Sequence, residues 1–151
     1  MNKIIVDGSD LELNNYEILN KYFRKNYKLY MRAWSQINKE YAVWFPYIHE
    51  TNEEPKGKFG GTKNCVNILT HNGMDIFEYD YSKSPDEDTR PMEFNQKRFV
   101  FGKIGKTIQF LGVFVRTPYK GEQYLTYKYV RIAREFDTDT LFSNDMQFGN
   151  K

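Results

Sequence analysis

The chain has 151 residues, of which 40% are hydrophobic and 28% charged, and this composition is typical of one globular domain with its own core. Its single cysteine, Cys65, fits neither a disulfide framework nor a zinc ribbon, and the formal net charge of only +2 excludes a uniformly basic protein. No apolar run reaches the roughly 18 residues of a transmembrane helix and no signal-peptide core opens the chain, so we expect a cytoplasmic protein without a membrane partner.

The first predicted element is an amphipathic helix at about residues 10–25. Apolar side chains recur at helical spacing from Tyr16 to Phe23, and Asp10, Asn14 or Asn15 can cap its start. Apolar and polar residues then alternate from residue 27, which predicts a strand over residues 27–33.

The next apolar run, residues 41–48, is predicted as a strand that Pro46 stops or bends, because proline cannot donate to a ladder. A polar loop of unusual length follows at residues 49–64, and loops of this length are commonly functional or disordered. Residues 65–81 predict a β-hairpin whose Asn72 and Gly73 suit a type I′ turn. A second polar loop covers residues 82–97.

Residues 98–117 predict a second hairpin, with Gly105 and Lys106 as its tight turn. Both faces of its second strand are apolar, which indicates a central strand covered on two sides. We assign Ile108, Phe110 and Phe114 to one face and Leu111, Val113 and Val115 to the other. Residues 124–132 alternate as a last strand, and an acidic tail follows.

One N-terminal helix and six or seven strands predict an α+β fold, either a small curled antiparallel sheet or a PUA-like β-barrel. We expect residues 1–151 to form a single domain. Its parts are a helix at about 10–25, a β core at about 27–134 and a tail at 137–151.

Positive charge is concentrated in one region of the chain. Residues 97–134 hold nine Lys and Arg against one acid, whereas residues 1–96 hold 12 against 15 and residues 135–151 hold one against four. Such asymmetry is typical of a polyanion site, although strand edges also favour lysine. The predicted contacts with a nucleic-acid backbone are Lys97, Arg98, Lys103, Lys106, Arg116, Lys120, Lys128, Arg131 and Arg134.

Aromatic residues are unusually frequent, at 12 Tyr, 12 Phe and 2 Trp. The phenylalanines at alternating strand positions are expected in the core, but the tyrosines and tryptophans exceed what one small core can bury. Such rings stack on nucleic-acid bases while their polar atoms stay wet. The predicted base pocket consists of Trp34, Trp44 and Tyr47 with Asn67 and Asp75; the alternative is that both tryptophans are ordinary core residues.

Catalysis is the weaker interpretation of the titratable residues. His49 and His71 lack the spacing of metal ligands, and the period of a strand places Asp75 on the face opposite to Glu78 and Asp80. We therefore expect no catalytic residue, no metal and no cofactor.

Four segments carry a resemblance to a known group of domains. They read N-x-L-x-x-x-G-x-x-I-x-E at 67–78, R-F-V-F-x-K at 98–103, F-L-G-V-F at 110–114 and Y-x-x-V-R-I at 127–132. In this order they resemble accessory domains of bacterial restriction and phage-defence proteins, and they are similar to the PUA-like group, which includes the SRA-type domains that read modified cytosine by flipping it. The resemblance covers residues 65–134 and implies a DNA partner, but it identifies no pocket residue.

The sequence therefore favours a non-catalytic module that binds DNA and recognises a modified base, in a restriction or phage-defence context. An effector nuclease or another protein is a further expected partner. Two alternatives stay open: a protein-interaction or inhibitor module of phage or mobile-element origin, and a metal-dependent nuclease that uses Glu78 and Asp80.

Overall fold

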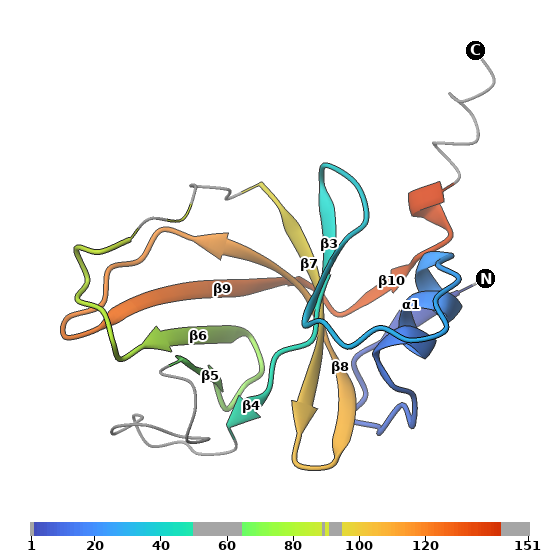
Figure 1. Ribbon diagram of the computed structural model, residues 1–151, viewed down its shortest axis with the longest axis horizontal. Coiled ribbons are helices and arrows are strands. Elements are labelled where there is room, and N and C mark those ends of the chain that lie inside the picture. The colour runs from blue at the N-terminus through green and yellow to red at the C-terminus, as the bar shows by residue number, and fades with distance from the viewer. Residues whose placement is uncertain (1, 50–64, 89, 91–94, 143–151) are drawn as a thin grey trace.

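The computed structural model describes residues 2–49, 65–88, 90 and 95–142 (Figure 1). Within these ranges the elements are β1 (Lys3–Ile5), α1 (Asn15–Phe23), β2 (Trp34–Gln36), β3 (Tyr41–Trp44), β4 (Ile48–His49), β5 (Cys65–Leu69), β6 (Asp75–Asp80), β7 (Lys97–Ile104), β8 (Thr107–Thr117), β9 (Leu125–Ala133) and β10 (Glu135–Asp137). None of the described helices is both long and apolar enough to cross a membrane. The long predicted loop at 49–64 lies, after His49, outside the described residues.

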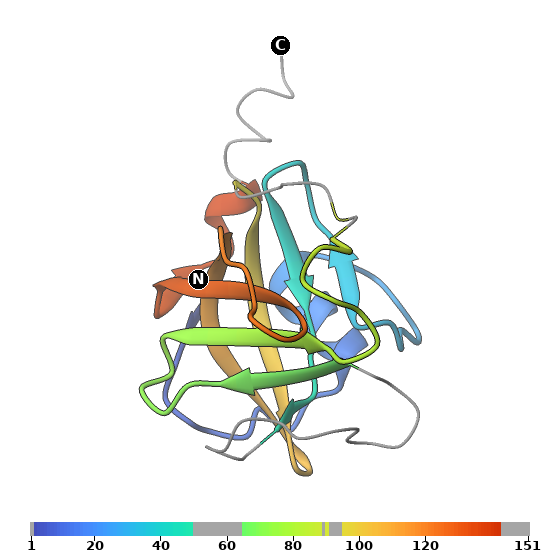
Figure 2. The same cartoon turned by 90° about the vertical axis from the view of Figure 1, so that its left-hand side faces the viewer.

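Eight strands form one curled sheet in the order β2-β3-β7-β8-β9-β6-β5-β4, and β1 pairs with β10 in a separate ribbon. Most neighbours are antiparallel, but β3 is parallel to β7 and β4 is parallel to β5. An isolated bridge from Tyr47 to Lys103 also brings the chain between β3 and β4 alongside β7. The sheet wraps around its own inner face without closing into a barrel (Figure 2). The predicted α+β fold with a small curled sheet is thus confirmed. Within the described residues, however, the sheet is mixed rather than purely antiparallel, open rather than a closed barrel, and made of eight strands rather than six or seven.

The predicted helix is confirmed, with closer bounds. Asn14 caps it: its side chain accepts the Glu17 N–H at 3.1 Å, and the Glu17 carboxylate accepts the Asn14 N–H at 3.1 Å. Figure 1 shows α1 at the end of the molecule where β1 and β10 lie. Its buried face includes Leu19 and Phe23, and the Phe23 ring packs 5.0 Å from the Phe99 ring of β7.

The predicted strand at 27–33 is wrong. These residues form a loop, and the first strand of the large sheet begins at Trp34. The Asn20 side chain bonds both backbone polar groups of Tyr27, so the chain leaves α1 as an irregular segment. Leu29 and Met31 are 68% and 81% exposed, so the apolar residues that alternate with polar ones in this segment do not face the core.

Strand β8 is covered on both sides, as predicted, but its faces are assigned differently. Phe110 and Val113 pack in the core beneath α1, whereas Leu111 and Phe114 pack in a second core on the inner face of the sheet. The pairing of β8 with β9 shifts register at Val113/Phe114, and a bulge there changes which residues share a face.

Both predicted hairpins are confirmed. In the β7–β8 turn Gly105 has a φ of 61°. The β5–β6 turn is not type I′, because a type I′ turn needs positive φ at both central residues and only Gly73 has it, not Asn72.

Candidate functional site

The inner face of the curled sheet gathers polar and aromatic side chains from strands far apart in sequence. Residues directly opposite each other on neighbouring strands point to the same face. Trp34 of β2 opposes Trp44 of β3, while Asn67 of β5 opposes Glu78 of β6. Glu78 in turn opposes Tyr127 of β9.

At the centre of this face Arg98 is surrounded by aromatic rings. Its guanidinium carbon lies 4.2 Å from the Tyr129 ring centre, 4.7 Å from Trp34 and 5.1 Å from Trp44. We call these three rings the aromatic box. Burial lowers the pKa of Arg98 from its ordinary value. No described carboxylate forms an ion pair with Arg98, so ring faces are the main surroundings of this charge.

A carboxylate lies beside the box. Arg90 Nη1 donates to Glu78 Oε1 at 2.7 Å, and the hydroxyl of the buried Tyr129 donates to the same oxygen at 3.1 Å. Arg90 also donates to the Tyr129 hydroxyl at 3.1 Å. Burial, followed by the charge of Glu78, raises the pKa of Tyr129 far above its usual range. Tyr129 is therefore a fixed hydrogen-bond donor that holds Glu78 in place.

A second polar group anchors the segment before Arg90 to the same face. Asp88 accepts hydrogen bonds from Arg116 Nη2 at 3.0 Å and from the Tyr127 hydroxyl at 2.8 Å. Burial and this hydrogen bond to Asp88 raise the pKa of Tyr127 to about 12. The Arg90 guanidinium lies 3.9 Å from the Tyr127 ring centre. These contacts bring two side chains of the 82–97 segment to the rim of the box.

A cavity of about 290 Å³ opens next to the box. Its lining residues are Ala33, Trp34, Trp44, Glu78, Arg90, Gln96 and Arg98. Flat rings, a carboxylate acceptor and guanidinium donors together suit a planar heterocycle that carries hydrogen-bonding groups on its edge. On the same face Asn67 Oδ1 is buried, and no described residue donates to it.

The structure brings together part of the predicted base pocket. Trp34 and Trp44 are two of the three rings of the aromatic box, and Asn67 shares its face. Tyr47 is 56% exposed and packs its ring edge on His49, away from the box. Asp75 opposes Val130 on β9 and therefore points to the other face of the sheet.

The nine predicted backbone contacts do not form one strip. Arg98 and Arg116 point inward, and Arg116 is only 8% exposed. Lys97 pairs with Glu40 at 3.2 Å and Lys120 with Asp86 at 2.7 Å, both on the surface.

The remaining five are spread over the molecule. Lys106 is exposed in the β7–β8 turn, and Lys103 stands near the same end of β7. Lys128 lies over aromatic rings on the outer face, Arg131 packs against the hairpin glycine Gly73, and Arg134 is exposed beside Val6.

Sequence reasoning missed the roles of Glu78, Arg90, Gln96 and Tyr129. The sequence suggests Glu78 only as a metal ligand, and the described residues contain no group of three acidic, His or Cys side chains that could hold a metal ion. The pairing of β6 with β9 places Glu78 beside the tyrosines, and period-two alternation along β9 already puts Tyr127 and Tyr129 on one face. Arg90 and Gln96 come from a loop without periodicity, so no sequence signal pointed to them.

Comparisons with known proteins agree with this architecture. Residues 4–138 match the family model of the SRA domain, the SET and RING associated domain. A solved structure with a similar fold is that of the 5-hydroxymethylcytosine-specific restriction enzyme AbaSI, with a TM-score of 0.63 and 19% sequence identity over 90% of this chain. The match covers 42% of that enzyme's chain. A search of the curated proteins finds no match. The resemblance to SRA-type domains inferred from residues 65–134 is therefore confirmed, over a longer range.

Proposed function

Because the chain belongs to the SRA (SET and RING associated) domain family, we propose that it binds DNA and recognises a modified base in the cavity beside the aromatic box. The observation that carries this proposal is the combination of ring faces, a carboxylate and guanidinium groups around one cavity on the inner face of the sheet. A base reaches such a cavity only after it has left the double helix.

In this mechanism, the free-energy cost of extruding the base is offset largely by stacking in the cavity. Extruding a base costs a few kcal/mol, and one aromatic stack returns roughly 1–3 kcal/mol. Trp34, on the edge strand β2, offers a ring that is only partly buried, and the Arg98 guanidinium offers a second planar surface. The remaining free energy comes from hydrogen bonds to the edge of the base and from contacts with phosphates.

The hydrogen-bonding groups favour cytosine. Cytosine carries an amino donor, which carboxylates accept, next to ring acceptors that guanidinium groups can satisfy. Glu78 supplies the carboxylate, while Arg98 and Arg90 supply the donors. Asn67, opposite Glu78 on β5, is a further polar group on this face, although it does not line the cavity itself.

Phosphate contacts in this proposal come from basic side chains at the surface, above all the exposed Lys106 and Arg134 and the partly exposed Lys103. Arg98, which the sequence predicts as a contact with the nucleic-acid backbone, is instead proposed as part of the base pocket. Since each phosphate contact releases counterions, binding must weaken steeply with salt.

A restriction or phage-defence context is part of the same proposal. It is supported by the fold shared with a restriction enzyme, of whose chain the match covers less than half. We infer that a nuclease, either on the same polypeptide or as a separate subunit, is the partner that acts on the DNA which this module binds.

The test compares affinities for duplexes of one sequence that carry cytosine, 5-methylcytosine or 5-hydroxymethylcytosine at one position, at about 50 and 200 mM salt. We expect tighter binding to one modified duplex, and a loss of this preference in Trp34→Ala but not in the matched control Tyr47→Ala. Equal affinity for all three duplexes, or equal effects of the two substitutions, would refute the proposed pocket.

A further inference from the structure

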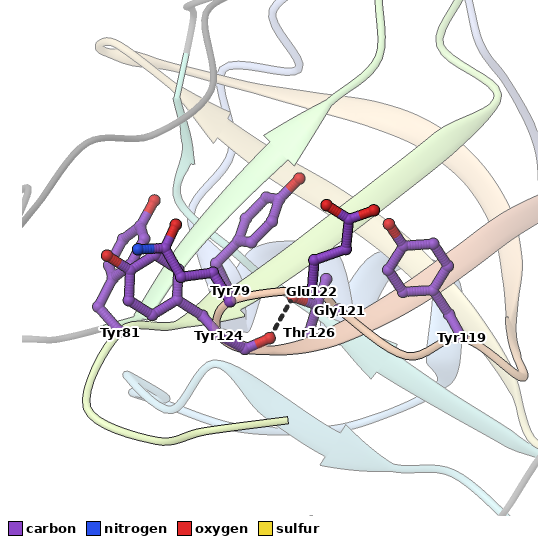
Figure 3. Close-up of a pocket in the computed structure, with 8 residues that line it drawn as sticks. Tyr79, Tyr81, Tyr119, Gly121, Glu122, Tyr124 and Thr126 are labelled. Atoms are coloured by element: carbon purple, nitrogen blue, oxygen red, sulfur yellow. Dashed lines mark hydrogen bonds between the residues drawn. The ribbon is translucent and has the colours of Figure 1, made fainter. Parts of the chain in front are cut away.

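A second cavity, of about 260 Å³, lies on the outer face of the sheet (Figure 3). Its lining residues are Tyr79, Tyr81, Tyr119, Gly121, Glu122, Gln123, Tyr124 and Thr126. On β6, Tyr79 lies between Glu78 and Asp80, whose side chains face inward. Because successive side chains of a strand alternate between its faces, the Tyr79 ring is on the outer side. This cavity, which we call the tyrosine site, is thus separated from the aromatic box by the sheet itself.

Three of the rings form a corner. The Tyr81 and Tyr124 rings meet at 86° with centres 4.7 Å apart, and the Tyr79 ring is parallel to that of Tyr81, with a centre distance of 6.3 Å. Tyr119, which is 48% exposed, faces them from the other side. Figure 3 shows the Glu122 carboxylate between Tyr119 and the other three rings.

The backbone of the β8–β9 connection is packed closely around this site. Thr126 Oγ1 donates to the Tyr124 carbonyl at 3.0 Å. A Cβ on Gly121 would lie only 2.3 Å from that same carbonyl oxygen, so this position has no room for a side chain. The loop therefore holds Glu122 and Tyr124 in a defined arrangement.

The chemistry of the lining favours a cation. Aromatic faces carry negative electrostatic potential and attract ammonium groups, and a carboxylate adds a full negative charge. Glu122 is exposed and forms no ion pair with any described residue. On the adjacent part of the same face, Lys128 Nζ already lies 5.6 Å from the Phe77 ring centre and 5.9 Å from that of Tyr119. A polyanion, in contrast, would be repelled by Glu122.

We infer that the tyrosine site binds an organic ammonium ion through its ring faces and Glu122. Two sources share this chemistry: a free amine, such as a quaternary amine, and the alkylated lysine side chain of a partner protein. The inference does not depend on DNA reading, because the two sites lie on opposite faces of the sheet.

The test titrates the full chain with choline and with 3,3-dimethylbutan-1-ol, its neutral isostere, and follows backbone amide chemical shifts around residues 119–126. Choline should bind about tenfold more tightly than the alcohol, since only the charged compound gains cation–π energy. Glu122→Gln, at an exposed position, should weaken choline binding severalfold and leave the alcohol unaffected. Tyr124→Phe should retain binding, whereas Tyr124→Leu should weaken it about two- to fivefold.

A peptide with one trimethyllysine, and the same peptide with unmodified lysine, distinguish the two sources. Tighter binding of the trimethyllysine peptide than of choline assigns the site to a partner protein, and equal or weaker binding assigns it to a free amine. If choline causes no saturable shift, or if the alcohol binds as tightly as choline, the inference is wrong.

Discussion

The hydroxyl of Tyr129 donates a hydrogen bond to Glu78 Oε1 at 3.1 Å, across the pairing of β9 with β6. The same ring forms one wall around Arg98. A single buried side chain thus positions both the carboxylate and the guanidinium of the proposed base pocket. Since Tyr129 is fully buried, the position of these two groups depends on the core of the domain, in addition to the contact of Arg90 with Glu78.

Tyr129→Phe should separate these two roles. The substitution keeps the ring wall but removes the donor, so we expect the free energy of unfolding to fall by about 1 kcal/mol. The preference for a modified duplex should weaken severalfold because Glu78 loses its orienting partner. Urea denaturation and duplex titration measure the two effects. Unchanged base preference would show that Tyr129 does not position Glu78.

Arg98→Met should affect binding without a comparable effect on folding. Methionine fills a similar volume among the rings, and removing a buried charge also removes its desolvation cost, so stability should change by less than about 1.5 kcal/mol. Base preference should be lost, because methionine neither donates hydrogen bonds nor offers a planar face. A variant that retained full preference for the modified duplex would exclude Arg98 from the pocket.

Asp88 should contribute to stability above about pH 4. Burial alone would raise its pKa, but hydrogen bonds from the Arg90 N–H and the Tyr127 hydroxyl, together with the charge of Arg116, lower it below the ordinary value of 3.8. The folded state therefore binds fewer protons than the unfolded state, and this stabilisation is lost as the pH falls through the folded pKa.

Asp88→Asn removes this contribution. Between about pH 5 and 3 the free energy of unfolding should fall less steeply in the variant than in the wild type. Denaturant titrations at a series of pH values provide the slopes, and parallel slopes would contradict the role given to Asp88.

Much of the fold could be predicted from sequence, because strong local signals determine it. Helix periodicity and the capping candidates Asp10, Asn14 and Asn15, of which Asn14 is the cap, predicted α1. The β-rich runs around Gly73 and Gly105 predicted the two hairpins. The parallel pairing of β3 with β7 depends on contacts between distant segments, which no local pattern contains. The alternation of apolar and polar residues at 27–33 predicted a strand wrongly, because an extended segment becomes a strand only when its backbone pairs with a neighbouring strand.

From the sequence, the type of site that we propose could be inferred, but only some of the residues that line it. Aromatic surplus and local basic charge indicated nucleic acid, and both tryptophans were placed in the pocket. Arg98 was assigned to phosphate because composition does not reveal that its side chain points into the core. Tyr47 and Asp75 lie apart from the tryptophans: Tyr47 follows β3 and bridges to Lys103, and Asp75 faces the other side of the sheet from β6. Neither arrangement follows from local sequence.

Gly112 should be among the least replaceable positions in β8. Its φ is 122°, and an added Cβ would lie 2.4 Å from Arg131 Cδ and 2.8 Å from the Ala133 carbonyl. Gly112→Ala should therefore cost about 3 kcal/mol or more, from backbone strain and overpacking together. Gly105→Ala is the matched control: its φ is 61° but nothing lies within 4 Å, so about 1–2 kcal/mol is expected. Equal losses in thermal or urea denaturation would show that packing at Gly112 is unimportant.

Intrinsic tryptophan fluorescence reports directly on whether an extruded base enters the proposed pocket. The chain contains two tryptophans, Trp34 and Trp44, and both line the proposed pocket. If an extruded modified base stacks there, titration with a duplex containing that base should change tryptophan emission saturably, and the same duplex with plain cytosine should change it much less. Tight binding of the modified duplex without any change in tryptophan emission would show that the base does not stack in this pocket.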